Sequence, residues 1–235
     1  MTSMNDADVI LYDEIHQAAA GGRAKAEWLL HFLQDGVLLG PMGPVAVPAI
    51  TIIGATTEVG KLAPTIVSRF LVPPLTAYGL ADATLIAQQM TPAVFTSCGL
   101  PLPGQDLCLA VAHAGNRNPR AIRSILNTVR DLALVEGFPE TGYDIAATLK
   151  MLEITPDGLT LTMTRYLTLL HDSFEGAAGA TVMASVMQEP GGLTEVERVL
   201  QQKGLITLTP RGRQLSDVGV RRAQSIQRAH GPLGT

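Results

Sequence analysis

The sequence predicts a mixed α/β chain in three parts: an incomplete parallel-sheet domain, an all-helical domain and a C-terminal winged helix. Three observations lead to this prediction. The apolar run Val9–Tyr12 ends in two carboxylates, segments with helical periodicity fill the middle, and the last third reads as three helices followed by a hairpin. We expect the parts to span residues 1–76, 77–155 and 156–218, with a basic tail over 219–235.

The first part contains two short apolar runs that we expect to form parallel strands. Asp13 and Glu14 follow the run Val9–Tyr12, and Gly54–Thr57 follows the run Ala49–Ile53. The carboxyl ends of parallel strands form the ligand-binding edge of such a sheet. There Asp13 would hold Mg²⁺, usually through water, and Glu14 would polarise an attacking water. Taken alone, the carboxylates could equally belong to a strand that runs into a solvated turn.

A phosphate-binding loop of the form G-x-x-x-x-G-K-[ST] is expected before a strand of this kind, and only eight residues precede Val9. The segment Gly54–Leu62 looks superficially similar. However, five residues separate its glycines, and Leu62 stands where a Mg²⁺-binding Ser or Thr is needed. We therefore expect Lys61 to be a solvated loop lysine, and the chain resembles an ATPase that begins in the middle.

An arginine follows the second expected strand at the end of a short helical stretch, Ala63–Val67. Arg69 could reach across a subunit interface and neutralise the charge that develops during phosphoryl transfer. The commoner role of such a side chain is a surface pair with a carboxylate.

The middle part reads as three helices, over Leu80–Met90, Gln105–Ala114 and Arg120–Val135. Pro119 presets the entry to the third helix, which places Arg120 in its first turn, facing whatever occupies the cleft.

The last part reads as helices over Thr164–Phe174, Ala180–Met187 and Leu193–Lys203. A hairpin follows whose turn, Pro210–Gly212, should thrust Arg211 and Arg213 outward towards phosphates. We expect Val220–His230 to be a basic helical tail or a disordered end.

The net charge of −4 hides an asymmetry along the chain. From Arg198 onward, seven basic side chains face one carboxylate, Asp217, whereas the preceding residues carry 10 basic and 20 acidic side chains. A basic end on an acidic body suits contact with DNA, because phosphate neutralisation supplies most non-specific affinity. The alternative is a solvated basic end that binds nothing.

Composition favours a cytoplasmic protein with no membrane segment. The chain is 46% hydrophobic and 16% charged, and its start lacks a basic region followed by an apolar core. Cys98 and Cys108 suggest neither a zinc site nor a disulfide framework. We expect His16, His31 and His113 to pack or to form structural hydrogen bonds.

Several motifs in order resemble the RuvB family of AAA+ ATPases, the bacterial motors of Holliday-junction branch migration. They are Asp13-Glu14-Ile15-His16, Gly54-Ala55-Thr56-Thr57 and Ser68-Arg69-Phe70. Farther along, Asn116–Arg123 is similar to the family's sensor 2 segment, and Thr209–Arg213 is similar to its DNA-binding wing.

The resemblance implies ATP and Mg²⁺ as cofactors, a hexameric homo-oligomer, and double-stranded DNA or a DNA junction as partner. It also implies roles for eight residues. They are Asp13 and Glu14 in the Walker B motif, Thr57 as a sensor, Arg69 as an arginine finger, Arg120 as the sensor 2 arginine, and Arg211, Gly212 and Arg213 in the wing.

Two departures from the family modify these expectations. Gly36–Pro48 reads as a short Gly/Pro-rich link in place of the family's longer hairpin, which docks RuvA, so we do not expect a RuvA-like partner to dock in the usual way. Leu71–Pro74 alters the strand that leaves the arginine finger.

Without the phosphate loop, the chain alone would bind nucleotide only weakly, because that loop supplies most β/γ-phosphate contacts. A non-catalytic winged-helix adaptor that keeps an ATPase remnant as an oligomerisation surface is the alternative. A winged-helix transcription regulator, with a coincidental similarity upstream, is a third.

Overall fold

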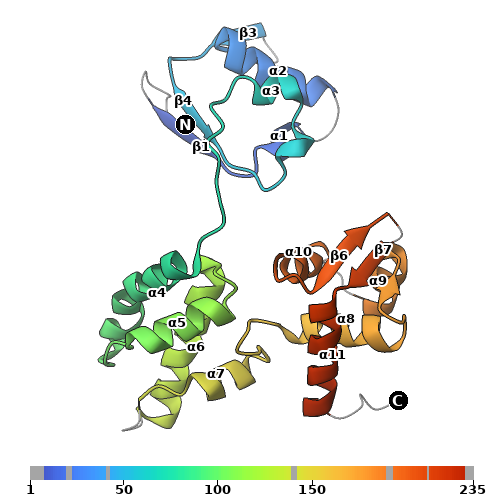
Figure 1. The fold of residues 1–235 in the computed structure, drawn as a ribbon. Helices are drawn as coiled ribbons and strands as arrows, with labels where there is room; N and C mark the ends of the chain where they lie inside the picture. Colours follow the sequence, from blue (N-terminus) through green and yellow to red (C-terminus); the bar gives the residue numbers. More distant parts are fainter. Residues whose placement is uncertain are drawn as a thin grey trace. The chain divides into compact units, whose positions relative to one another are not determined.

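The computed structural model describes residues 8–19, 23–40, 43–138, 142–188, 193–210 and 212–230. The chain divides into two compact units, Met1–Thr76 and Ala77–Thr235 (Figure 1). The first unit is α/β, and the second contains a group of helices followed by a winged helix.

The first unit is built on a pair of parallel strands. Its elements are β1 (Val9–Tyr12), α1 (His16–Ala19), α2 (Arg23–Asp35), β2 (Val37–Gly40), β3 (Gly43–Ala46), β4 (Thr51–Gly54), the 3₁₀ turn η1 (Val59–Lys61) and α3 (Pro64–Val67). Strand β1 pairs with β4 in a register that runs from Val9 opposite Thr51 to Tyr12 opposite Gly54. The two expected apolar runs are therefore neighbouring parallel strands, as the sequence predicted.

The core of the first unit is small. Its buried residues are Ile15, Leu29, Leu62 and Ile66. On the strands, Val9, Leu11 and Ile53 remain 62%, 68% and 51% exposed. Parallel strands are normally covered on both faces, so this sheet leaves apolar surface uncovered.

The segment Gly36–Pro48 is a hairpin, and its interpretation as a link was wrong. Strands β2 and β3 pair antiparallel, from Val37 opposite Ala46 to Gly40 opposite Gly43. Pro44 fits because a two-stranded hairpin consists of edge strands, where a missing N–H donor is tolerated.

The second unit begins with four α-helices that pack around one core. They are α4 (Leu80–Phe95), α5 (Gln105–Ala114), α6 (Pro119–Glu136) and α7 (Ile145–Met151), with the 3₁₀ turn η2 (Thr96–Cys98) after α4. Helix α4 continues through Pro92, past the predicted end at Met90, because Val94 and Phe95 are buried in this core. Helix α7 was not predicted, and the Asp144 carboxylate caps it by accepting from Ala147 N at 2.9 Å.

The winged helix completes the second unit. Its elements are α8 (Leu161–Asp172), β5 (Ala177–Ala178), α9 (Ala180–Met187), α10 (Thr194–Gln202), β6 (Ile206–Thr209), β7 (Gly212–Leu215) and α11 (Asp217–His230). The three short strands form an antiparallel sheet in the order β5-β7-β6. Tyr166, Leu167, Leu170, Met183 and Leu200 are fully or almost fully buried in its core.

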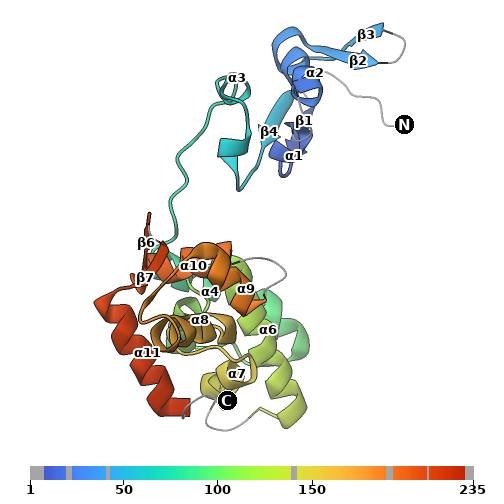
Figure 2. The same cartoon turned by 90° about the vertical axis from the view of Figure 1, so that its right-hand side faces the viewer.

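The segment expected to be a basic tail is helix α11, and it belongs to the core of the winged helix. It packs against α8, and the two helices lie side by side in both views (Figures 1 and 2). Ala223 and Ile226 on its inner face are 0% and 7% exposed. An amphipathic pattern within the arginine-rich segment therefore gives a packed helix.

The two cysteines are free thiols. Cys98 is exposed, whereas Cys108 is buried on α5, and burial raises the pKa of the Cys108 thiol. In the part of the chain that the structure describes, no helix combines the length and the apolar character needed to cross a membrane.

Gly219 lets α11 approach the preceding strands closely. A Cβ at this buried position would collide with the Leu205 carbonyl oxygen and lie 3.2 Å from Leu215 Cδ2. We expect Gly219→Ala to destabilise the chain by about 1–3 kcal/mol, because the helix must shift outward. Urea unfolding measures this loss, and Ser225→Ala on the exposed face of α11 should stay within about 0.5 kcal/mol of wild type. Equal stability of both variants would contradict this packing.

Candidate functional site

The turns that follow β1 and β4 lie at the same end of the first unit's sheet. Tyr12 is the last residue of β1 and pairs with Gly54, the last residue of β4. The pairing continues beyond the strands, because Ala55 N donates to Tyr12 O and Ile15 N donates to Ala55 O, each at 2.9 Å. The two predicted motifs therefore leave the sheet side by side.

Glu14 and Thr57 are brought together by this arrangement. The Glu14 carboxylate accepts from Thr57 N at 3.3 Å and from Thr57 Oγ1 at 3.4 Å. These hydrogen bonds are long, and the Glu14 side chain is 35% exposed, so one face of the carboxylate remains open to solvent. Such a carboxylate can orient a water molecule.

Glu14 also has an unusual backbone. Its φ of 51° lies in the left-handed region, which costs a non-glycine residue about 1–2 kcal/mol. Conformations of this kind concentrate at functional sites, where the surrounding structure holds them. The strain at Glu14 therefore supports a functional interpretation of this turn.

Asp13 is exposed and has one described hydrogen bond at its carboxylate, from Glu14 N to Oδ1 at 3.0 Å. Among the described residues, no group of three metal-ligating side chains comes together. A single exposed carboxylate suits Mg²⁺, which in proteins keeps several waters and takes its other ligands from substrate phosphates. Asp13 fits that role, and a cage made only of protein side chains is not formed by the described part of the chain.

His16 is buried and hydrogen-bonded, which confirms the expectation that it packs and forms structural hydrogen bonds. Its side chain is 10% exposed, and Nδ1 lies 2.8 Å from Thr56 Oγ1 and 3.1 Å from Glu14 Oε2. Its Nε2 lies 3.2 Å from Glu58 Oε2. The imidazole thus joins the turn after β1 to the turn after β4, and its place in Asp-Glu-Ile-His was the only signal in the sequence.

Glu58 continues this network towards solvent. Lys61 Nζ lies 2.7 Å from Glu58 Oε2, and this hydrogen bond keeps the pKa of the Glu58 carboxyl below its usual value. Lys61 is exposed and pairs with Glu58, which fits its interpretation as a loop lysine.

Arg69 follows α3 and is exposed. Its guanidinium donates to the Thr65 carbonyl oxygen at 3.0 Å and to Gln34 Oε1 at 2.6 Å. Both acceptors are neutral, and no carboxylate of the described residues pairs with it, so its positive charge is available to an anion. The commoner fate of a surface arginine, an ion pair, is not realised within the described chain.

Arg120 lies in the second unit, in the first turn of α6. The side chain of Asn118 caps this helix and accepts from Arg120 N at 2.9 Å, while Pro119 occupies the first helical position. The Arg120 side chain is exposed. The sequence-based placement of Arg120 in the first turn is therefore confirmed, whereas its contact with nucleotide stays a prediction.

The wing departs from the prediction at Arg213, and Arg211 lies outside the described residues. Gly212 begins β7 with a φ of 128°, and a Cβ there would collide with the Ala178 carbonyl oxygen. Arg213 does not point outward. Its Nε and Nη2 donate to the two oxygens of Glu197 at 2.8 and 2.7 Å, and its side chain is 26% exposed.

The reason lies in helix α10, which carries Glu197 on its inner face. The Glu197 side chain is 8% exposed, and Tyr166 OH also donates to Oε1, at 3.1 Å. A buried carboxylate requires partners, because an unpaired buried charge is costly. Burial, and then the charge of Glu197, raise the pKa of the Tyr166 phenol. Arg213 is thus committed to the core.

Other basic side chains of the C-terminal part are also paired internally. Arg198 pairs with Glu195 at 2.5 Å, and Arg222 pairs with Asp157 at 2.6 Å. Arg221 and Arg228 on α11 are exposed and have no carboxylate partner among the described residues. The excess of positive charge counted along the sequence therefore overstates what the surface offers.

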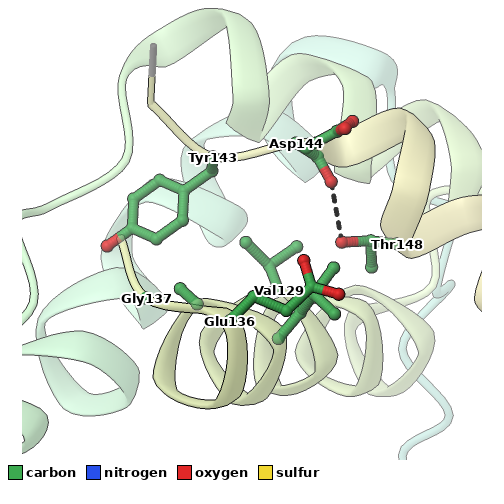
Figure 3. A pocket seen from close by; sticks show the side chains of 8 residues that line it. Val129, Glu136, Gly137, Tyr143, Asp144 and Thr148 are labelled. Atoms are coloured by element: carbon green, nitrogen blue, oxygen red, sulfur yellow. Dashed lines mark hydrogen bonds between the residues drawn. The ribbon is translucent and has the colours of Figure 1, made fainter. Parts of the chain in front are cut away.

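The helical part of the second unit contains a small hollow of about 140 Å³ between α6 and the start of α7 (Figure 3). Two of its polar side chains are hydrogen-bonded within the protein: Thr148 Oγ1 donates to Asp144 O at 3.0 Å, and Tyr143 OH donates to Pro101 O at 2.5 Å. None of the predicted site residues lines it. We assign no function to this hollow.

Comparison with known proteins gives a consistent family. Residues 156–223 match the family model described as the RuvB C-terminal winged helix domain. The Holliday junction branch migration complex subunit RuvB of Lactobacillus gasseri is 30% identical over 231 residues. The chain is RuvB-like. The match covers 92% of this chain and 65% of that relative, so the RuvB-like chain spans about two thirds of its relative's length.

Solved structures support the same fold. The Thermotoga maritima RuvB Holliday junction branch migration motor has a TM-score of 0.77 at 22% identity, over 94% of this chain and 71% of that one. A lysine-to-arginine mutant of the same protein gives 0.78 at 23% identity, with the same coverage. The predicted fold class, an AAA+ α/β part with a helical lid and a winged helix, is confirmed.

The buried pair in the winged helix leads to a stability prediction. We expect Arg213→Met to destabilise the chain by about 3 kcal/mol, because it leaves the Glu197 carboxylate buried without its cation. Adding Glu197→Leu to Arg213→Met should restore much of that loss, since the unpaired charge is then gone. Denaturant unfolding of both variants measures the difference. If Arg213→Met keeps full stability and instead weakens DNA binding, Arg213 acts outward.

Proposed function

We propose that this RuvB-like chain is a subunit of an ATP-dependent DNA motor that acts in Holliday-junction branch migration during recombination and repair. The observation that carries the proposal is the apposition of Glu14 and Thr57 where the paired strands β1 and β4 end. That arrangement supplies a strained, half-open carboxylate beside a hydroxyl at the ligand-binding edge of a parallel sheet.

In this proposal, Glu14 polarises the attacking water and Thr57 reports the state of the γ-phosphate. Asp13 would hold Mg²⁺ through water, and the ion would neutralise charge on the phosphates when bound. His16 positions both turns, because it contacts Glu14 and Thr56 from one side and Glu58 from the other.

Two arginines, one in each unit, have proposed roles towards nucleotide. The charge of Arg69 is unpaired within the described chain, which suits a finger acting in trans on the nucleotide of a neighbouring subunit in a homo-oligomeric ring. Arg120, at the exposed start of α6, would contact nucleotide as the sensor 2 residue.

The winged helix would bind duplex DNA through its phosphates. Helix α10 presents no base-reading pattern, since Glu197 is turned inward and Glu195 is paired with Arg198. We therefore propose sequence-independent contact that salt weakens strongly. The wing turn, with Arg211 and Gly212, remains part of this proposal, whereas Arg213 is not.

The β2–β3 hairpin brings a RuvA-like partner back into the proposal. The sequence-based objection to such a partner was a shortened docking hairpin, and the segment does form a hairpin, with two strands of four residues each. Val45 on β3 is 59% exposed and is therefore accessible as an apolar anchor for a partner.

A second function is favoured by one observation, the exposed apolar side chains Val9, Leu11 and Ile53 on the β1–β4 sheet. The chain would then be a non-catalytic DNA-binding adaptor whose α/β unit serves as an oligomerisation surface. The two functions differ in their response to MgATP.

Glu14→Gln separates the motor from the adaptor. For a motor subunit we expect the rate of MgATP hydrolysis, measured by phosphate release, to fall at least 100-fold, because the water loses its polarising carboxylate. Nucleotide binding and DNA affinity should stay within twofold of wild type. Glu153→Gln is the matched control, since Glu153 is exposed and has a similar backbone, with a φ of 53°. A wild-type chain that binds no MgATP but binds DNA would establish the adaptor instead.

Val45→Asp tests the hairpin as a docking element. We expect affinity for a bacterial RuvA, measured by calorimetry, to fall at least tenfold, because a charge replaces an apolar anchor. Val59→Asp is the control, since Val59 is 51% exposed in the same unit but lies in η1. Equal loss in both variants, or no loss in either, would contradict docking at the hairpin.

A further inference from the structure

The loop between α7 and α8 joins the helical lid to the winged helix. On the lid side, Asn116 Nδ2 donates to Gly158 O at 2.7 Å, and His113 Nδ1 lies 3.0 Å from Pro156 O. On the winged-helix side, Lys203 Nζ donates to Asp157 O at 2.5 Å, and Arg222 Nη2 donates to Asp157 Oδ1 at 2.6 Å. Three consecutive residues of one loop, Pro156, Asp157 and Gly158, thus bind both domains.

The close approach of the two domains depends on Gly158. Its φ is 80°, and a Cβ at this position would lie 2.6 Å from Asn116 Oδ1 and 2.7 Å from Ala114 O. The turn that contains Asn116 is therefore seated directly on the loop. Since Arg117 follows Asn116 in the chain, the Arg117 backbone also lies beside this loop.

Arg117 is held there by a well-defined turn. Asn116 and Arg117 have φ values of 53° and 59°, and Arg117 N donates to Ala112 O at 3.0 Å. Two successive non-glycine residues in the left-handed region are rare, so this turn is fixed by its surroundings. The Arg117 side chain is exposed and has no hydrogen-bond or ion-pair partner among the described residues.

Positive charge exceeds negative charge at this junction. The charges that act on Lys203 are those of Asp157, Arg117 and Arg222, which makes three cations around one carboxylate. Burial gives the Lys203 ammonium a pKa below its usual value; the Asp157 charge opposes this shift, and the Arg117 and Arg222 charges add to it. The Asp157 carboxylate stays ionised, because the Thr155 and Arg222 interactions outweigh its own burial and lower its pKa.

A joint between domains does not require this excess. The Asp157 carboxylate is already paired with the Arg222 guanidinium, and the Lys203 ammonium binds a neutral group, the Asp157 carbonyl oxygen. Arg222 Nε is buried without a hydrogen-bond partner, so the pairing with Asp157 through Nη2 does not use all the donors of this guanidinium. A preorganised group of cations whose charge is not neutralised internally is the arrangement that binds phosphate oxygens.

We propose that Arg117, Lys203 and Arg222 form a phosphate-contact site for the backbone of duplex DNA at the junction of the lid and the winged helix. The site is separate from the wing turn, and it rests on the proposed DNA-binding function. Duplex DNA is favoured over an acidic protein because Lys203 and Arg222 flank the sheet of the winged helix itself, at the end of α10 and on α11.

Arg117→Asn tests the site without disturbing the fold. Asparagine tolerates the left-handed backbone at this position and removes the charge. We measure the affinity for a duplex of about 30 base pairs as a function of salt concentration. One lost phosphate contact should reduce the slope of log K against log salt by about 0.9 and weaken binding equally across sequences. Arg117→Lys should keep most of the slope.

Arg130→Gln is the matched control. It removes the same charge from α6, about 16 Å along the helix from Pro119, and should leave the slope unchanged. If wild type binds DNA and Arg117→Asn keeps the wild-type slope, the junction site is overturned while the proposed DNA binding stands. If wild type binds no duplex DNA, both fail together. Binding of polyglutamate that depends on Arg117, with unaltered DNA binding, would also overturn the site in favour of an acidic protein.

Discussion

The parallel pairing of β1 with β4 is the constraint on which the proposed nucleotide chemistry depends. A slip of one residue would move every side chain of a strand to the opposite face, and Tyr12 would no longer end opposite Gly54. The register therefore decides whether the carboxylate after one strand meets the hydroxyl after the other. Only four residues pair on each strand, so the backbone bonds beyond the strands and the His16 side chain help to fix that register.

The second unit is organised by charges that are satisfied inside the protein. Glu197 pairs with Arg213 in the winged-helix core. Asp157 pairs with Arg222 at the loop between the lid and the winged helix. Both pairs join elements that are distant in sequence, and local patterns contain no information about such partners. The net charge of a segment therefore gives the charge at its surface only after these internal ion pairs have been subtracted.

Most elements of this fold could be predicted from the sequence, because apolar periodicity and helix-capping residues are local signals. Helix α5 and helix α9 have the predicted bounds, and α6 differs by one residue at each end. The misses have tertiary causes: the burial of Phe95 extends α4 past a proline, and packing on α8 orders α11. The site was predictable where a strand end fixes it, at Glu14 and Thr57, and not at His16 or Arg213, whose partners come from elsewhere in the chain.

The left-handed backbone of Glu14 affects which residue types stability would favour at this position. Glycine would relieve the strain there, so folding alone favours losing this carboxylate by about 1 kcal/mol. The residue that would be most stable at this position therefore differs from the residue that the proposed hydrolysis requires. Glycine and asparagine adopt the left-handed backbone at lower cost, so stability alone would favour either of them over glutamate at residue 14.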